Sequence, residues 1–241
     1  MPLPFVCVIV TAACIQKRSI ISMSCFTKAD LEGRSIPNLS FVLDDRQASS
    51  FFQILQRGFM LYALVGCTVE SFLTDQIGLS RAYVRERIQS VFLDGKPVDD
   101  LNSAMIRDGS HLSLSAAMPG LVGATMRTGG IYSGFRSTIT HHERDIPIVR
   151  EKGCLHLKFF NLLMKELGSD MLKKGIYVQS SHLVDILSTE SPEFWNGCKK
   201  ITLNGYPMSR DSFQEGERLT RFTLVLLSVI TPGDMAGLPS S

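Results

Sequence analysis

One strand-and-turn pattern occurs twice in this chain. Residues 91–98 read VFLDGKPV, and residues 201–208 read ITLNGYPM. In each copy an apolar run leads into Asp-Gly or Asn-Gly, dipeptides that reach positive φ at little cost, and a proline then fixes φ just beyond the turn. The pattern predicts one β-hairpin in each half of the chain.

Composition limits the classes of protein that fit this sequence. The chain has 241 residues, of which 44% are hydrophobic and 20% are charged, as in ordinary globular proteins. The formal net charge of +2 gives no reason to expect a nucleic acid, an anionic membrane or an acidic partner. The six cysteines include no C-x-x-C pair, which favours reduced thiols in a cytoplasmic protein.

The first residues form an apolar run that does not fit a targeting signal. No basic residue precedes the run, whereas Lys17 and Arg18 follow it. The run is also too short to span a bilayer. We therefore interpret residues 1–38 as an N-terminal extension, with Met23 as an alternative start, and we expect no membrane association.

Residues 39–120 show a regular succession of apolar patterns. The segment 39–43 alternates as a strand, an apolar stretch follows Gly58, and a helix is predicted to begin at Thr68, where the threonine suits an N-cap. Ser80 offers a second cap before the hairpin motif, and 111–115 alternates as a last strand. The predicted order is strand, strand, helix, strand, turn, strand.

The second half of the chain repeats this plan in the same order. Residues 155–160 correspond to 39–43, and residues 174–176 correspond to 57–59. The repeat predicts an internal duplication. After the N-terminal extension, the chain is thus predicted to contain a first domain at 39–120, a glycine-rich interdomain segment at 121–154, a second domain at 155–233 and a tail at 234–241.

Two stretches carry a family resemblance. Residues 66–73 resemble the start of the helix in the small sulfur-carrier proteins of thiamine and molybdopterin synthesis. Residues 89–97, together with 108–114, are similar to the last third of ubiquitin. The resemblance implies an α+β fold of two tandem β-grasp (ubiquitin-like) domains arising from an internal duplication.

The segment from Pro119 to Ser137 has the most unusual composition in the chain. It combines five glycines with arginines, and exposed backbone N–H groups beside forked guanidinium donors suit an anion. The candidate ligand-binding residues are Arg127, Gly129, Gly130 and Arg136. The alternative is an ordered linker that packs its apolar side chains between the two halves, and these are Leu121, Val122, Met126, Ile131, Tyr132 and Phe135.

The same segment also permits a carrier role. Arg127-Thr128-Gly129-Gly130 resembles the end of ubiquitin, whose family acts through a C-terminal Gly-Gly. Because this pair is internal, such a carrier would require cleavage after Gly130. The alternative is that the two glycines simply bend a loop.

A further resemblance points to nucleic acid. Residues 77–98 are similar to an S4-type RNA-binding motif, in which a helix starting at Leu-Ser-Arg presents arginines just ahead of a strand. It implies Arg81, Arg85 and Lys96 as RNA contacts, with affinity that falls as salt rises. The alternative is that these arginines form the solvated face of a helix.

Nothing in the sequence predicts catalysis or a cofactor. The glycine-rich segment fits no P-loop or dinucleotide fingerprint, and the adjacent side chains of His141, His142 and Glu143 diverge on any regular element. We expect no metal, no cofactor and no catalytic residue. The sequence favours a non-enzymatic binding or scaffolding protein whose partner is a protein or a small anionic ligand, with the sulfur carrier and the RNA binder as alternatives. It leaves the oligomeric state open.

Overall fold

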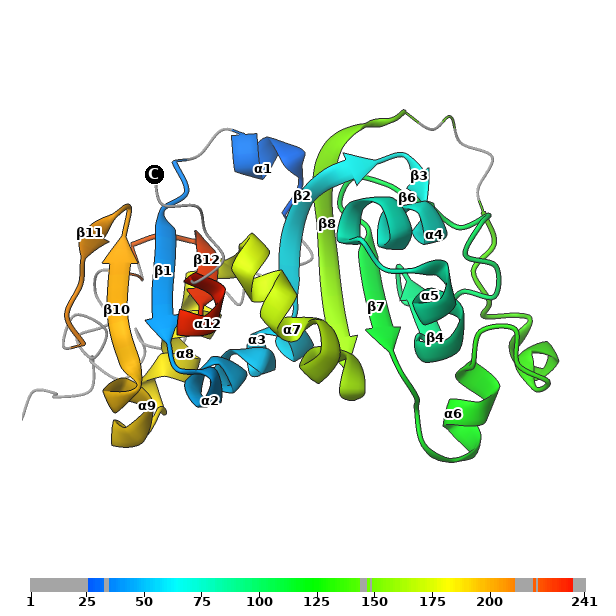
Figure 1. Ribbon diagram of the computed structural model, residues 1–241. Helices are drawn as coiled ribbons and strands as arrows, with labels where there is room; N and C mark the ends of the chain where they lie inside the picture. The colour runs from blue at the N-terminus through cyan, green and yellow to red at the C-terminus, as the bar shows by residue number, and fades with distance from the viewer. Residues whose placement is uncertain are drawn as a thin grey trace, which may run out of the picture.

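The computed structural model describes residues 26–32, 35–143, 147, 149–210, 219 and 221–235. They form an α+β fold around one ten-strand mixed sheet, accompanied by a two-strand sheet (Figure 1). The predicted extension falls mostly on residues 1–25, and most of the predicted tail on 236–241, so both calls lie largely outside the described residues.

Short strands and helices alternate along the chain. The strands are β1 (Asn38–Leu43), β2 (Phe59–Val65), β3 (Cys67–Thr68), β4 (Ser90–Leu93), β5 (Lys96–Pro97), β6 (Met105–Ile106), β7 (His111–Ser115), β8 (Glu151–Phe160), β9 (Ile176–Gln179), β10 (Cys198–Leu203), β11 (Tyr206–Pro207) and β12 (Leu224–Ile230). The helices are α1 (Lys28–Glu32), α2 (Asp45–Ala48), η2 (Ser49–Phe51), α3 (Phe52–Arg57), α4 (Val69–Ser71), η3 (Phe72–Ile77), α5 (Arg81–Arg87), α6 (Gly120–Met126), η4 (Ser133–Arg136), α7 (Leu162–Lys174), α8 (Ser180–Ser188), α9 (Pro192–Asn196) and α12 (Pro232–Met235).

The large sheet contains the same pairing pattern twice. Its strand order is β11-β10-β1-β12-β9-β2-β8-β7-β4-β5. From the centre outward, β2 is antiparallel to β8, β8 parallel to β7, and β7 antiparallel to β4. In the other half β9 is antiparallel to β12, β12 parallel to β1, and β1 antiparallel to β10. Each half ends in a hairpin, and the two halves meet where β2 lies antiparallel to β9.

The two hairpins have the same register and the same turn. Leu93 pairs with Lys96 in one, and Leu203 pairs with Tyr206 in the other. The first turn residues, Asp94 and Asn204, have φ of 51° and 52°, and the glycines that follow them have φ of 78° and 82°. Positive φ at both central residues is the geometry that Asp-Gly and Asn-Gly favour. The predicted hairpins are therefore confirmed.

The predicted fold of two tandem β-grasp domains is wrong. Strand β1, assigned to the first domain, lies between β12 and β10 of the second. Strand β8, assigned to the second, lies between β2 and β7 of the first. The strand registers also contradict the predicted correspondence. Residues 39–41 of β1 pair with β10 in the same way as residues 112–114 of β7 pair with β4. Strand β1 therefore corresponds to β7 and not to residues 155–160. Alternation and turn residues indicate where strands lie but not which strands pair. The sequence-based prediction therefore placed β1 and β8 in the wrong halves.

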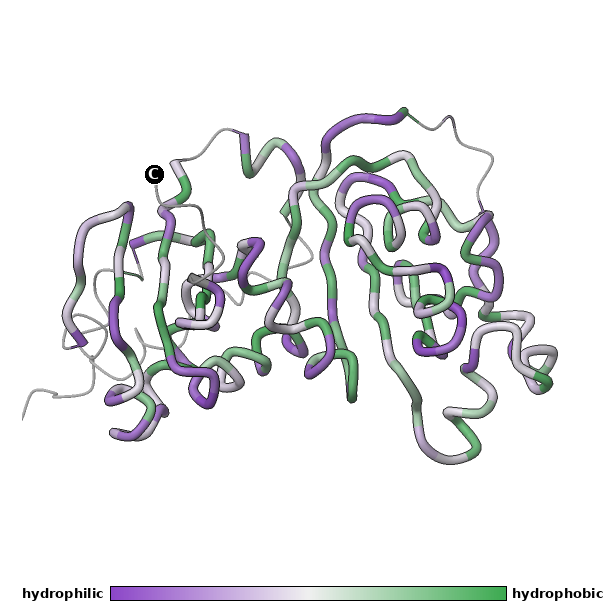
Figure 2. Tube along the Cα trace, viewed as in Figure 1, coloured by the Kyte–Doolittle hydropathy of each residue, from purple (hydrophilic) through white to green (hydrophobic). Residues whose placement is uncertain are grey.

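A single core runs under both halves of the sheet. One face packs against α3, α7, α8, α9, η3 and α5 in one continuous cluster of buried apolar side chains, which includes Phe41, Phe59, Leu112 and Leu227. Apolar residues follow the strands through the middle of the molecule (Figure 2). The opposite face is covered at its centre by a smaller cluster of Phe26, Leu31, Met60, Cys154 and Leu224.

Helices α3 and α7 cross in front of the middle of the sheet (Figure 1). The crossing is close, because a Cβ added to Gly168 of α7 would lie 2.8 Å from the ring of Phe52. Helix α7 also contacts α5, since Glu166 accepts hydrogen bonds from the Tyr83 hydroxyl at 2.6 Å and from Arg87 Nε at 2.8 Å. These bonds, those from Arg87 first, lower the pKa of the Glu166 carboxyl to about 2.

We predict that both halves unfold as one unit. Leu112→Ala removes a fully buried side chain from β7 and should reduce the free energy of unfolding by about 2–5 kcal/mol. Trp195, the one tryptophan of the chain, lies in α9 under the other half. The unfolding midpoint that Trp195 fluorescence reports in a urea titration should therefore decrease by the full amount expected from this loss of stability.

The control for this experiment is Leu121→Ala, which truncates an exposed leucine and should leave the midpoint nearly unchanged. If Leu112→Ala shifted circular dichroism in a separate step and left the Trp195 transition in place, the two halves would be independent.

Candidate functional site

The glycine-rich segment leaves the sheet after β7 and returns to it at β8. Helix α6 begins just after Pro119, η4 follows it, and the chain then passes the β4–β5 hairpin, where the His141 N–H donates to the Pro97 carbonyl at 2.8 Å. Figure 1 shows this excursion at the lower right, beyond the outer edge of the sheet. The segment is thus placed beside one half of the sheet and not between the two halves.

Arg136 fixes the segment from within. Its side chain is only 3% exposed, and its Nη2 and Nη1 donate to the two Asp99 carboxylate oxygens at 2.6 and 3.1 Å. Nε donates to the Thr125 carbonyl at 2.6 Å, and Nη2 also donates to the Arg127 carbonyl at 3.2 Å. Bidentate arginine–carboxylate pairs are among the stronger and more directional contacts in proteins. The guanidinium group of Arg136 therefore ties α6 and η4 to the loop that carries Asp99.

The other predicted ligand-binding residues lie in a turn next to this pair. Gly129 has φ of 60°, and its N–H donates to Asp99 Oδ1 at 3.0 Å. The Gly130 N–H donates to the Arg127 carbonyl at 3.1 Å, and the Thr128 N–H donates to the Gln89 carbonyl at 2.8 Å. The backbone of this turn is held against the sheet domain, while the Arg127 side chain is exposed.

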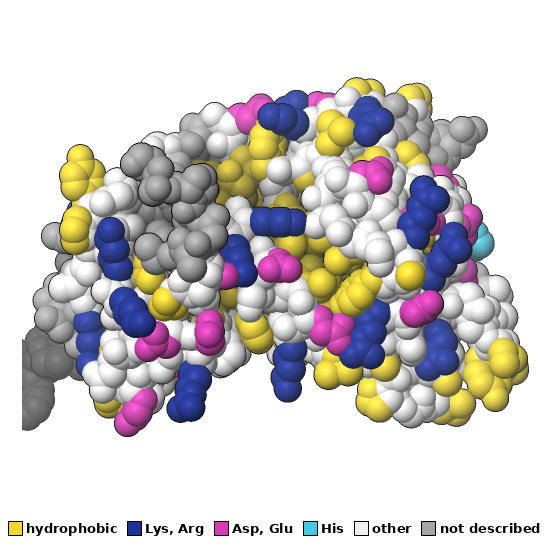
Figure 3. Space-filling model, in the orientation of Figure 1, with side chains coloured by type: hydrophobic (Ala, Val, Ile, Leu, Met, Phe, Trp, Pro, Cys, Tyr) yellow, Lys and Arg dark blue, Asp and Glu magenta, His cyan; other side chains and the backbone are white. Residues whose placement is uncertain are grey.

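Large apolar side chains of the segment face solvent. Ile131 is 96% exposed, Phe135 84% and Leu121 76%. The apolar loop surface, as we call it, consists of Leu121, Val122, Ile131, Tyr132 and Phe135. Yellow side chains gather over this part of the molecule in Figure 3. The expectation that these residues pack between the halves is wrong, because their side chains are exposed at the far end of one half.

A charged pocket of about 410 Å³ lies between α5 and the turn at Thr128. It brings together Arg85 and Arg127, which the sequence assigned to two different functions. Four carboxylates also line it, those of Glu70, Glu86, Asp99 and Asp100. Hydrogen bonds from Asn102 and Ser103 hold the pKa of the Asp100 carboxyl below its usual value. The pocket therefore holds more acidic groups than basic ones.

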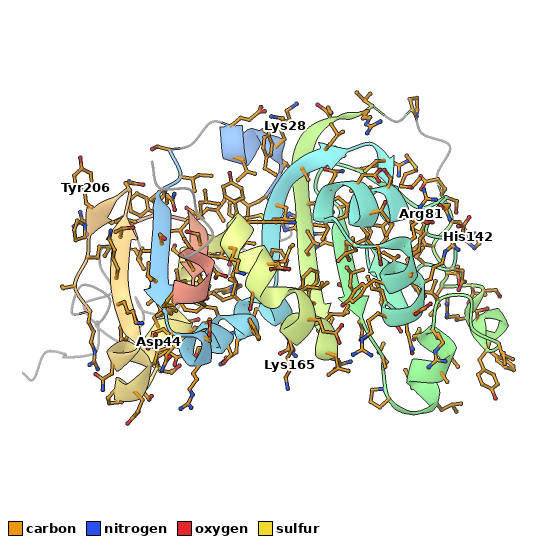
Figure 4. All side chains as sticks on the ribbon, in the orientation of Figure 1. Lys28, Asp44, Arg81, His142, Lys165 and Tyr206 are labelled. Atoms are coloured by element: carbon orange, nitrogen blue, oxygen red, sulfur yellow. The ribbon has the colours of Figure 1, made fainter. Side chains whose placement is uncertain are left out.

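The predicted RNA contacts occupy two elements. Arg81 and Arg85 project from α5 into solvent, and Figure 4 shows Arg81 at the right of the molecule. Each has a guanidinium nitrogen 3.9 Å from Glu70 Oε1. Lys96 lies on the edge strand β5 and is exposed. The structure thus brings Arg81 and Arg85 together around a carboxylate and puts Lys96 on a different element.

An apolar groove on the open face of the sheet was not found from the sequence. It encloses about 460 Å³ and runs across β4, β7 and the end of β8, where Phe92 and Phe160 flank Ser113 and Ser115. Asn161 closes one end with φ of 57° and ψ of −131°, and its side-chain amide donates to Ser115 Oγ at 3.0 Å. Met118 and Pro119 line the other side and lead into α6. The sequence signal for this groove is that Phe92 and Phe160 are apolar, while the residues that pair with them, Ser113 and Ser115, are polar.

His141 and Glu143 take part in structural contacts, whereas His142 is exposed. Glu143 Oε2 accepts a hydrogen bond from the Met105 N–H at 2.8 Å, and Glu143 Oε1 lies 2.6 Å from Arg107 Nη2. His141 Nε2 lies 3.5 Å from Glu143 Oε2. Among the described residues, no three histidine, cysteine, aspartate or glutamate side chains converge as a metal site would require. Nor is any helix in this part of the chain long and apolar enough to cross a membrane.

We predict that Arg136→Ala loosens the segment. It removes hydrogen bonds that involve charged groups, each worth about 1.5–3 kcal/mol, so local opening of residues 120–140 should become at least about tenfold more frequent. Limited proteolysis with thermolysin, which cuts beside large apolar residues, should accelerate in the segment by that factor.

The matched control is Arg127→Ala, which removes an exposed guanidinium and keeps the backbone carbonyl that Arg136 binds. Equal cleavage of both variants at the wild-type rate would show that the Arg136–Asp99 pair does not hold the segment.

No protein-family model, curated protein or solved structure matches this chain. Its function must therefore be argued from the geometry of its own residues. That geometry provides an anchored apolar loop surface, a charged pocket with mixed signs, and an apolar groove on the open sheet face.

Proposed function

We propose that this chain is a non-enzymatic binding protein that docks onto a protein partner through the apolar loop surface. The observation that carries the proposal is the concentration of exposed large apolar side chains on one short segment. Soluble proteins seldom expose contiguous apolar patches unless the patch is an interaction site. Aromatic residues such as Tyr132 and Phe135 are also enriched at protein interfaces.

The anchoring of the segment supports a specific interface. The buried Arg136–Asp99 pair holds η4 in place, and the rings of Tyr132 and Phe135 stack with centroids 6.2 Å apart. A surface whose conformation is already set loses less entropy when a partner binds. Such a surface suits a partner with a complementary apolar groove.

Charge argues for a protein partner over a small anion. The pocket that contains Arg85 and Arg127 has four carboxylates against two guanidinium groups, and Arg136 is already committed to Asp99. With the Asp99–Arg136 pair set aside, three carboxylates still face two guanidinium groups, which disfavours an anion in this pocket. The ligand-binding role of Arg127, Gly129, Gly130 and Arg136 thus becomes, in this proposal, the role of a scaffold that supports the apolar loop surface.

The same reasoning places RNA and carrier functions second. Glu70 lies between Arg81 and Arg85 and offsets part of their charge toward phosphate. Basic and acidic side chains also lie next to one another on the right of Figure 3. A carrier would need its Gly-Gly free to project, whereas the Gly129 N–H is bonded to Asp99. The proposal includes a reducing, cytoplasmic setting, consistent with the thiols of Cys67 and Cys198, which form no disulfide among the described residues.

The test is a photo-crosslink made in the protein's own cells. Tyr132 is replaced by benzoylphenylalanine, and irradiation should yield a covalent adduct with one protein partner. Adding either Ile131→Ser or Phe135→Ser should weaken the complex by about 30-fold or more, because truncating a central interface anchor costs about 2 kcal/mol or more. Binding should persist in 1 M NaCl, since apolar contacts are not screened.

The matched control carries the crosslinker at Tyr206, which is exposed at the opposite end of the sheet (Figure 4). Crosslinking of equal yield at both positions, an adduct with nucleic acid, or no adduct at position 132 would each refute the proposal. An RNA binder would instead lose its complex on Arg81→Ser with Arg85→Ser and in high salt.

A further inference from the structure

Two histidines stack on the face of the sheet that the helices leave open. His111 of β7 and His156 of β8 are paired in register, so their side chains lie on the same face. Their ring centroids are 4.4 Å apart, and the ring planes meet at 10°. At this distance the rings pack well when both are neutral, whereas two imidazolium cations would repel each other.

His156 connects this stack to the first described residues of the chain. Its ring is buried, and Nε2 lies 2.8 Å from the Phe26 carbonyl oxygen. A carbonyl oxygen only accepts, so Nε2 carries the proton and Nδ1 is the unprotonated nitrogen. Nδ1 is buried and has no hydrogen-bond partner among the described residues. A proton added at Nδ1 would thus find no acceptor there.

Residues 26–32, which we call the strap, cover the centre of the open face. Phe26 and Leu31 pack on Met60, Cys154 and Leu224. Figure 4 shows Lys28 above β2 and β8, where its Nζ lies 2.6 Å from Glu151 Oε2. Among the described residues, one small apolar cluster, the His156 contact and polar contacts at its surface attach the strap to the sheet.

Polar groups at both ends complete the attachment of the strap. The backbone N–H of Lys28 donates to the Asp108 carboxylate at 3.2 Å. Asp108 Oδ1 also accepts from the backbone N–H of Cys154 at 2.7 Å. The Tyr62 hydroxyl donates to Glu32. These contacts connect the strap to the strands that carry the histidine stack.

We propose that the stacked pair His111–His156 is an acid-sensitive latch, which holds the strap on the sheet at neutral pH and releases it when the pair takes up protons. The inference is independent of the proposed protein-binding role. Release would expose Met60, Leu224 and the Cys154 thiol, all of which are buried while the strap is closed.

The charges around the pair agree with this direction. Burial lowers the pKa of both imidazoles, and a second cause acts on each, because Lys158 lies near His111, and His111 itself lies near His156. Asp94 faces His111, while Asp108 and the Phe26 carbonyl face His156, and these groups oppose the shift without reversing it. The Lys28 ammonium lies 2.6 Å from Glu151 Oε2, and Asp108 receives only the backbone N–H of Lys28.

The sign of the pH dependence follows from these shifts. The closed form holds both histidines neutral, and the open form lets them titrate near the ordinary value of about 6.5. The closed form is therefore fully favoured above that pH and loses its advantage as the pH falls below it. Each histidine changes the ratio of open to closed strap by up to about tenfold per pH unit in this window.

The experiment is hydrogen exchange of the strap amides in the full chain, between pH 7.5 and pH 5.5, corrected for the intrinsic pH dependence of exchange. In the wild type, protection of residues 27–32 should fall by tenfold or more relative to the amides of β8. In His111→Gln with His156→Gln the fall should disappear, because glutamine does not titrate and its amide Nε2 still donates to the Phe26 carbonyl.

A matched control and a second readout keep the proposal open to refutation. His182→Gln alters a half-buried histidine on α8 and should leave the response of the strap unchanged. Labelling of the Cys154 thiol by a pyridyl disulfide, which reacts over this pH range, should accelerate on acidification only when both His111 and His156 are present. Wild-type protection and labelling that do not change with pH would overturn the proposal, as would an unchanged pH response in a folded double glutamine variant.

Discussion

The union of the two halves of the sheet depends on the buried core that crosses the junction between β2 and β9. A single residue pair, Met60 with Tyr177, connects the two five-strand halves there. Beyond that pair the edge of β2 is capped by a side chain, because the Gln76 amide donates to the Leu64 carbonyl at 2.8 Å and accepts from the Leu64 N–H at 2.9 Å. So few strand contacts could not join two domains, and the continuity of the molecule comes from helices and core that cross the junction.

Local features of this fold could be read from the sequence with good accuracy. Thr68 and Ser80 do cap helices, with their hydroxyls accepting from the N–H groups of Ser71 and Tyr83. Gly58 and Gly175, matched in the repeat, both have positive φ and both precede a central strand. What alternation does not contain is the identity of the neighbouring strand. The exchange of β1 and β8 between halves therefore could not be foreseen.

The contacts of the glycine-rich segment differ from those that its composition led us to expect. Of the two arginines expected to face a ligand, Arg136 is buried, and the apolar residues that the alternative interpretation packed between the halves are exposed. Both outcomes have one cause. Asp99 lies on a different loop and forms an ion pair with the buried Arg136. A long-range pair of this kind leaves no periodic signal in the sequence. With the Arg136 guanidinium turned inward, Phe135, its neighbour on η4, faces solvent.

The open face of the sheet explains the remaining features of the molecule. Helices cover one face completely enough to bury a continuous core. The alternation of each strand sends its other side chains to the opposite face, on which the short helix α1 of the strap lies. At the centre these are Met60, Cys154 and His156, which the strap covers. Further along β7 and β8 they are Ser113, Ser115 and Phe160, which the strap does not reach and which form the groove. The strap and the groove are thus two outcomes of one constraint. Apolar residues on an open sheet face need a cover, and among the described residues the strap covers those at the centre of the face, with a histidine contact that acid can weaken.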